Sequence, residues 1–154
     1  MAEIKTYILI LHLAQDTTIR LGTLGDYTLP NGYYAYVDEA PANKLPQRLK
    51  QHLSPIKFPK IHIDYLQEAT MLEEIWFSDS VESRRDDWAD LLAAIPGGIV
   101  SVEGFGDEEE EETYLIYFEV RPQLEDFAVG AAKLFPNEVI LRAFSRPEPE
   151  NDSV

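Results

Sequence analysis

The sequence predicts an α+β domain: a small, mostly antiparallel sheet flanked by helices, with a C-terminal strand–helix–strand extension. Three observations lead to this prediction. The first strand-like segments are joined by short connections rich in Gly, Pro and Asn, which favour antiparallel neighbours. Apolar side chains at helical spacing begin only after these segments. The 154 residues, 45% of them hydrophobic, suffice for one buried core and are too few for two.

The first third of the chain consists of strand-like runs separated by turn residues. Residues 6–13 and 17–21 are rich in β-branched and large apolar side chains, and residues 33–37 are rich in aromatic ones. Each composition is typical of a strand that packs on at least one face. We therefore predict three strands here, with the glycines and prolines between them in the connections.

Residues 43–53 are expected to form the first helix. Asn43 is a suitable N-cap, and Pro46 lies in the first turn, where proline is tolerated. Leucines recur at every fourth position from 45 to 53 and predict the buried side of this helix. Basic side chains recur at the same spacing and predict a basic side that points outward: Lys44, Arg48 and His52.

The remaining elements follow from the same periodicities. A helix capped by Ser80 or Ser83 and ended by Pro-Gly-Gly at 96–98 has one apolar side, made by Trp88, Leu91, Leu92 and Ile95. The other predicted elements are helices over 63–69 and 124–135, and strands over 74–77, 99–102, 113–120 and 138–144. The last three elements along the chain, 113–120, 124–135 and 138–144, have the strand–helix–strand order of a βαβ unit. We expect one domain over 1–145 and a flexible acidic tail over 146–154.

The charge is unevenly distributed along the chain. The net formal charge is −15, and residues 107–112 are an unbroken acidic run. The window 40–63, in contrast, has basic side chains and no Asp or Glu. This window is a candidate surface for nucleic acid, because phosphates attract clustered cations, although a solvated helix and loop would explain it as well. The acidic run is instead a candidate surface for a basic protein partner.

Composition excludes several classes of protein. The absence of cysteine excludes disulfides and thiolate metal sites, and a cytoplasmic location is expected. No apolar run approaches the roughly 20 residues that cross a bilayer, so no membrane partner is expected. No G-x-S-x-G sequence is present, which argues against a serine hydrolase of that type.

Several short sequences occur in an order that resembles the GIY-YIG nuclease superfamily. They are Thr6-Tyr7-Ile8, the aromatic strand and its flank (29–37), and the stretches 48–52, 62–66 and 104–106. The resemblance is closest to a small branch with T-Y-x-L, L-P-x-G-Y-Y-x-Y-V-G, R-L-x-R-H, H-I-D-Y-L and G-F-G. It covers about 5–118, which implies a GIY-YIG-like core there and an extension over 119–145.

The resemblance implies a divalent-metal-dependent DNA endonuclease. The corresponding catalytic residues are Tyr7, Tyr36, Arg48 and His52, and the metal ligand, for Mg²⁺ or Mn²⁺, is Asp87. Tyr36 or Tyr7 would have the base-like role, and Arg48 would pair with phosphate oxygens. Taken singly, the tyrosines are better explained as packed strand aromatics, Arg48 as a surface arginine and His52 as a solvated helix residue.

Three departures from the family pattern point to attenuated catalysis. Asp38 stands where the family has glycine and places a negative charge beside the implied phosphate site. Asp87 stands where the family has glutamate, whose side chain is one methylene longer. The acidic run 107–112 follows Gly-Phe-Gly directly. The leading hypothesis is a GIY-YIG-like domain with attenuated nuclease activity; the alternative is a catalytically inactive member that acts as an acidic protein-binding or regulatory module.

Overall fold

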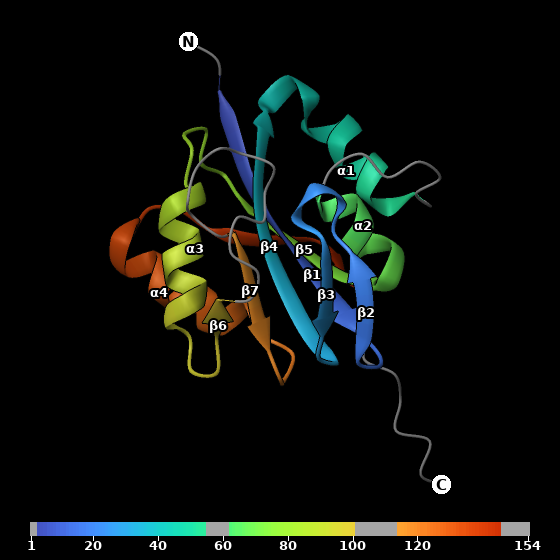
Figure 1. The fold of residues 1–154 in the computed structure, drawn as a ribbon. Helices are drawn as coiled ribbons and strands as arrows, with labels where there is room; N and C mark the ends of the chain where they lie inside the picture. Colours follow the sequence, from blue (N-terminus) through green and yellow to red (C-terminus); the bar gives the residue numbers. More distant parts are fainter. Residues whose placement is uncertain (1–2, 55–61, 101–113, 146–154) are drawn as a thin grey trace, which may run out of the picture.

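The computed structural model describes residues 3–54, 62–100 and 114–145. Two short 3-10 turns, η1 (Gly22–Leu24) and η2 (Ala42–Lys44), occur among the longer elements. In chain order the longer elements are β1 (Ile4–Leu13), β2 (Thr17–Arg20), β3 (Asp26–Leu29), β4 (Gly32–Pro41), α1 (Leu45–Leu53), α2 (His62–Ala69), β5 (Met71–Ser78), α3 (Arg85–Ala94), β6 (Ile99–Val100), β7 (Leu115–Phe118), α4 (Leu124–Leu134) and β8 (Ile140–Ser145). In Figure 1, α3 and α4 lie to the left of the main sheet and α1 and α2 to its right.

The main sheet has six strands in the order β6-β7-β4-β1-β5-β8, and each neighbouring pair is antiparallel. β2 and β3 form a separate two-stranded sheet. The predicted α+β class with a mostly antiparallel sheet is therefore confirmed. β3 lies where the sequence predicts only a connection, because its four residues are too few to show a clear alternation.

β1 is the central strand and is buried on both faces. It pairs with β4 from Ile4↔Pro41 to Leu13↔Gly32, and with β5 along its other edge. Residues 7–11 are fully buried, which explains why this stretch is apolar nearly throughout. Paired residues on antiparallel strands project to the same face, so this register decides which side chains meet.

The C-terminal strand–helix–strand is present, but its two strands are not neighbours. β7 pairs with β4, whereas β8 pairs with β5 on the other side of β1. Four antiparallel steps separate β7 from β8, so the two strands run in the same direction with three strands between them. The expectation of a simple βαβ unit is therefore corrected. Because β1, β4 and β5 already fill the middle of the sheet, β8 adds at a free edge.

α3 and α4 cover one face of the sheet. The Phe127 ring of α4 lies 5.7 Å from the Trp76 ring of β5 and 5.3 Å from the Trp88 ring of α3, measured between centroids. Trp88 is fully buried, as its place on the predicted apolar side of this helix requires. Thr6 of β1 projects to the same face, where its hydroxyl accepts a hydrogen bond from the backbone N–H of Arg84 at 2.8 Å.

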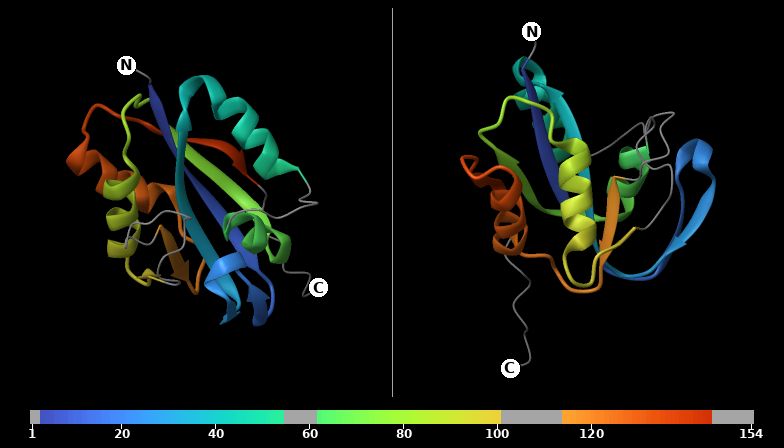
Figure 2. Two further views of the ribbon diagram at one scale, coloured as in Figure 1. Left: turned by 45° about the horizontal axis from the view of Figure 1, so that its top comes forward. Right: turned by 90° about the vertical axis from the view of Figure 1, so that its left-hand side faces the viewer.

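α1 and α2 cover the opposite face, to which Tyr7 of β1 projects. Leu66 of α2 is fully buried there. The right-hand view of Figure 2 shows α2 and α4 on opposite sides of the sheet. None of the helices in the described ranges is long and apolar enough to cross a membrane.

Neither predicted N-cap is used. Asn43 lies within η2, so α1 begins two residues later and has Lys44 as its N-cap, without a side-chain cap hydrogen bond. α3 has Arg84 as its N-cap, again without such a bond. The two serines expected as caps use their hydroxyls elsewhere, as in the hydrogen bond from Ser83 to Glu39. Tertiary contacts therefore override the local capping preference at both helices.

Candidate functional site

A cluster of polar side chains lies on the face of the sheet that α1 covers. Tyr7 of β1 and Asp38 of β4 are paired, so both project to this face. Tyr36 lies two residues before Asp38 on the same strand and projects the same way. The Tyr7 hydroxyl is 3.0 Å from Asp38 Oδ2. All three residues are buried, so the contact between Tyr7 and Asp38 is made away from bulk water.

Arg48 and His52 of α1 lie one helical turn apart and both reach this cluster. His52 Nε2 is 2.8 Å from the Tyr7 hydroxyl, and Arg48 Nη1 is 3.4 Å from Asp38 Oδ2. The expectation that this side of α1 points outward is wrong for His52, which is 7% exposed. Leu53, expected on the buried side, is 51% exposed. Leucines and basic residues share one four-residue spacing, so spacing alone does not show which side meets the sheet.

Gln67 of α2 fixes the tautomer of His52. Its Nε2 donates to the backbone carbonyl of His52 at 2.8 Å, which leaves its Oε1 as the acceptor 2.8 Å from His52 Nδ1. Nδ1 therefore carries a proton, and Nε2 of the neutral ring is an acceptor that faces Tyr7. Gln67 was not predicted from the sequence, because an amide on a different helix leaves no spacing signal.

Burial sets the protonation of the cluster. Burial lowers the pKa of His52, although the Gln67 hydrogen bond and the Asp38 charge act in the opposite direction. Neutral His52 and Asp38 then compete for the single proton of the Tyr7 hydroxyl. Burial first, then the charge of Asp38, and to a smaller extent Tyr36, raise the pKa of the Tyr7 phenol well above its ordinary value. Tyr7 is therefore a hydrogen-bond donor here and not a free base.

A second arginine reaches Asp38 from α3. Arg85 Nη2 lies 4.0 Å from Asp38 Oδ1, and the Arg85 guanidinium lies 3.8 Å from the centre of the Tyr114 ring. The Tyr114 hydroxyl donates to Asp86 Oδ1 at 2.7 Å. Neither Arg85 nor Tyr114 was predicted from the sequence as a site residue. Two adjacent arginines, Arg84 and Arg85, are visible in the sequence, but only the rotation of α3 decides which one faces the site.

Asp87 lies apart from the cluster. It is exposed in the first turn of α3, two residues after Arg85, and residues two apart on a helix do not face the same way. Its charge acts on Arg84, whose pKa is raised chiefly by a hydrogen bond to Glu138 and to a smaller extent by Asp87. Within the described ranges, no group of three or more His, Cys, Asp or Glu side chains is arranged to hold a metal ion. The structure thus brings Tyr7, Arg48 and His52 together, places Tyr36 on the same face, and leaves Asp87 to one side.

The basic window 40–63 is only partly covered by the described residues. Its two histidines, His52 and His62, are buried and add little to a positive surface. Its described cations that are exposed or half-exposed are Lys44, Arg48 and Lys50. The segment 55–61, the Gly-Phe-Gly sequence, the acidic run 107–112 and the tail 146–154 lie outside the described residues.

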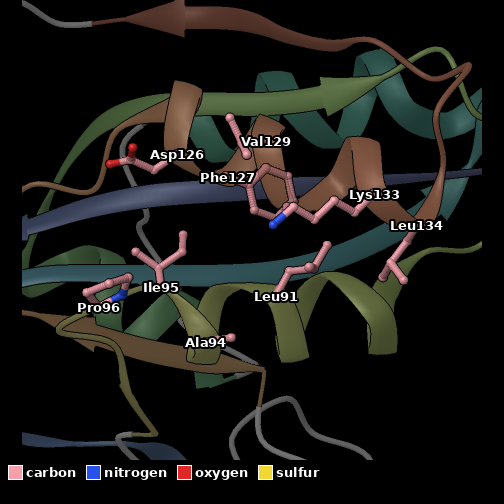
Figure 3. A pocket seen from close by; sticks show the side chains of 10 residues that line it. Leu91, Ala94, Ile95, Pro96, Asp126, Phe127, Val129, Lys133 and Leu134 are labelled. Carbon is pink, nitrogen blue, oxygen red and sulfur yellow. The ribbon is translucent and has the colours of Figure 1, made fainter.

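A separate, mainly apolar groove lies between α3 and α4, on the opposite face of the sheet from Tyr7. Its volume is about 620 Å³. Figure 3 shows Leu91 of α3, Ile95 directly after α3 and Phe127 of α4 along it, while its charged lining residues are Asp126 and Lys133. The groove contains none of the predicted site residues.

Comparison with protein families shows to which family this chain belongs. A family model described as a domain of unknown function, DUF123, matches residues 6–135. The match runs from β1 to the end of α4 and spans every residue of the cluster. A comparison with curated proteins gives no significant match, and neither does one with solved structures. Because the match covers most of the chain, the protein belongs to the DUF123 family of domains of unknown function.

Proposed function

We propose that this protein is a GIY-YIG-like domain that acts on the phosphodiester bonds of nucleic acid, with catalysis attenuated in the native chain. The observation that carries this proposal is the meeting of Tyr7, Arg48 and His52 at one point of the sheet. These are three of the residues that the GIY-YIG resemblance implies. Nothing in the fold class alone requires them to meet, because they come from two elements that are far apart in the sequence.

Two arginines lie at the cluster within an acidic chain. Arg48 and Arg85 both face the carboxylate of Asp38. The Arg48 side chain is 36% exposed, so it is accessible to a phosphate oxygen. Because the whole chain carries −15, a nucleic acid would approach only where cations are accessible, as Arg48 is here.

His52 and Tyr7 have the arrangement of a short proton relay. The Tyr7 hydroxyl would pass its proton to neutral His52 Nε2 while it takes one from a water that attacks phosphorus. The protonated His52 would return that proton, through Tyr7, to the oxygen that leaves. Asp38 Oδ2 competes for the same phenolic proton, and we therefore expect the relay to be slow. This competition is the physical basis of the attenuation that we propose.

The described residues do not fit a divalent metal ion at this cluster. Mg²⁺ or Mn²⁺ prefers oxygen ligands, and Asp87, the carboxylate that the resemblance implies, lies on the Arg84 side of α3. Asp38, the carboxylate inside the cluster, is already engaged by Tyr7 and Arg48. We therefore assign no step to a metal ion, and Asp87 as its ligand stays a prediction.

Incubation of the purified protein with DNA of varied structure tests the proposal, with Mg²⁺, Mn²⁺ and chelator as separate arms. We expect slow cleavage by the wild type and a loss of roughly a hundredfold or more for Arg48→Ala, because phosphate charge would go unneutralised. Asp87→Glu tests the ligand role that the resemblance implies: a higher rate in the metal arms would support that role, whereas an unchanged rate would agree with the position of Asp87 apart from the cluster. Lys133→Ala removes a cation from the distant groove and should cleave like the wild type.

Absence of cleavage by folded wild type and folded Asp87→Glu would contradict the nuclease proposal. It would favour the second candidate function, a catalytically inactive module that binds a basic protein partner through acidic residues. The observation on the side of this second candidate is Asp38. Its carboxylate takes two of the donors that a phosphate would need, the Tyr7 hydroxyl and the Arg48 guanidinium.

A further inference from the structure

We infer that Asp38 is a built-in anion: its carboxylate fills a subsite, made by Arg48, Arg85 and the Tyr7 hydroxyl, that takes a phosphate group when the carboxylate is removed. The ligand class is inorganic phosphate or a phosphate ester. The inference rests on the proposed function for the natural ligand, a nucleic-acid phosphate. It adds to that function the device that limits binding at the same site.

The two carboxylate oxygens of Asp38 face donors from four separate segments. Oδ2 is 3.0 Å from the Tyr7 hydroxyl and 3.4 Å from Arg48 Nη1. Oδ1 accepts from the backbone N–H of Glu39 at 2.8 Å and lies 4.0 Å from Arg85 Nη2. Guanidinium groups and hydroxyls bind carboxylates and phosphates by the same contacts, because both ligands present anionic oxygens. Aspartate is also uncommon in strands, so its presence in β4 reflects these donors and not a strand preference.

Two of the three side-chain donors, Tyr7 and Arg85, are held by contacts that do not involve Asp38. Tyr7 belongs to the central strand, and Arg85 is 6% exposed and stacked on Tyr114. Loss of the carboxylate would therefore remove, from a partly buried place, the anion that Arg48, Arg85 and the Tyr7 hydroxyl face, which is unfavourable. Phosphate supplies the missing negative charge together with further acceptor oxygens. We expect it to bind where the carboxylate was.

Comparison of Asp38→Ala with the wild type, in phosphate and in chloride of equal ionic strength, tests the inference. The thermal unfolding midpoint of Asp38→Ala should rise with phosphate concentration, whereas the wild type should behave alike in the two salts. Calorimetric titration with inorganic phosphate should show one site in Asp38→Ala and none in the wild type. Adding Arg48→Ala to Asp38→Ala should weaken phosphate binding about tenfold or more, as expected for a lost charged hydrogen bond.

Asp90→Ala is the matched control. It removes the same charge from an exposed position of α3, so it changes the net charge of the chain by the same amount. An equal phosphate response in Asp38→Ala and Asp90→Ala would show that the response depends only on the net charge of the chain, and would overturn the inference. Asp38→Asn removes the charge but keeps the shape of the side chain, and it replaces Asp38→Ala if that variant does not fold. A phosphate response in Asp38→Asn supports the inference; no response in it overturns the inference.

These outcomes separate the inference from the nuclease proposal. Phosphate binding by Asp38→Ala, with no cleavage by any variant, would keep the built-in anion and contradict the nuclease. Cleavage by the wild type, with no phosphate binding by Asp38→Ala, would keep the nuclease and contradict the built-in anion. If both proposals hold, Asp38→Ala should cleave DNA faster than the wild type. The carboxylate would then no longer compete with phosphate for the arginines, or with His52 for the Tyr7 proton.

Discussion

At the scale of single residues, the hydrogen bonds that join Gln67, His52, Tyr7 and Asp38 depend on one proton. When His52 is neutral, the Tyr7 hydroxyl has one proton for two acceptors. When His52 is protonated, Nε2 donates to Tyr7 and Tyr7 donates to Asp38, so every donor in the chain finds an acceptor. Burial opposes that protonation and lowers the pKa of His52. The completed hydrogen bonds would make the protein more stable in acid, whereas the burial of a charged His52 would make it less stable, so experiment can tell the two effects apart.

We predict that the wild type loses stability relative to His52→Gln as the pH falls below 6.5, the ordinary pKa of histidine. Between the lowered pKa of folded His52 and the ordinary value, the unfolded chain binds more protons. In this interval the free energy of unfolding therefore decreases as the pH decreases, by at most about 1.4 kcal/mol per pH unit for one proton. Above the ordinary value this contribution is constant. Urea unfolding of both proteins from pH 8 to pH 5 measures the difference; a gain by the wild type in acid would contradict the dominance of burial.

At the scale of elements, periodicity in the sequence located most helices and strands but not their rotation. α2 and α4 begin and end within about one residue of the predicted 63–69 and 124–135, because each has one clear apolar side. α1 has two residue series at the same spacing, and the prediction turned His52 to the wrong side. Arg85 was missed for the same reason, since the start of α3 has two adjacent arginines and no local rule separates them.

Two buried glutamates of β5 bind Arg121, which lies in the connection between β7 and α4. Buried Glu74 accepts hydrogen bonds from Trp76 Nε1 at 2.9 Å, Arg121 Nε at 3.0 Å and Arg142 Nε at 2.6 Å. Its buried neighbour Glu73 lies 3.8 Å from Arg121 Nη1. Both glutamates lie where the pairing of β5 with β1 shifts register. Arg121 is therefore the cation that the two buried carboxylates share.

We predict that Arg121→Met lowers the free energy of unfolding by roughly 3–5 kcal/mol, because it leaves buried carboxylates without their main counter-charge. Arg142→Met is the matched comparison. Its side chain is far more exposed than that of Arg121, so we expect a loss of about 1 kcal/mol or less. Denaturant unfolding of both variants measures the two losses. Equal losses would show that the network does not depend on the burial of Arg121.

At the scale of the whole molecule, β8 completes the sheet although the family match ends before it. The match stops at residue 135, and β8 then covers the outer edge of β5, for example through the pair Ile75↔Phe144. We predict that truncation after Val139 lowers the unfolding midpoint by roughly 10 °C, as expected for a loss of about 3 kcal/mol in a chain of this size. The bare edge of β5 should also make the protein associate as its concentration rises, which size-exclusion chromatography detects.

Truncation after Ser145 is the control for this experiment. It removes only residues 146–154, for which the sequence predicts a flexible tail, and should leave the unfolding midpoint unchanged. If both truncations lower the midpoint equally, the stabilising segment is the tail and not β8.

The fold class followed from composition and periodicity, but the strand order did not. Periodicity shows that a segment is a strand and carries no information about its partner, so the place of β8 beside β5 was not predictable from it. The candidate site was predictable only through the family resemblance, which named Tyr7, Arg48 and His52 from three separate motif positions. The resemblance also placed the charge of Asp38 beside the implied phosphate site. The contacts of Asp38 needed coordinates, because they depend on a cross-strand pair and on two helices at once.

The pairing of β1 with β4 also disfavours a wrong strand register during folding. A slip of one residue between these strands would turn Asp38 toward the face that α3 and α4 cover, and would leave a bare charge among tryptophan and phenylalanine rings. Misaligned chains are therefore penalised electrostatically, and a chain that reaches the correct alignment has assembled its polar centre in the same event. Assembly of the contact between Tyr7 and Asp38 after dilution from denaturant should accordingly keep pace with recovery of the native sheet.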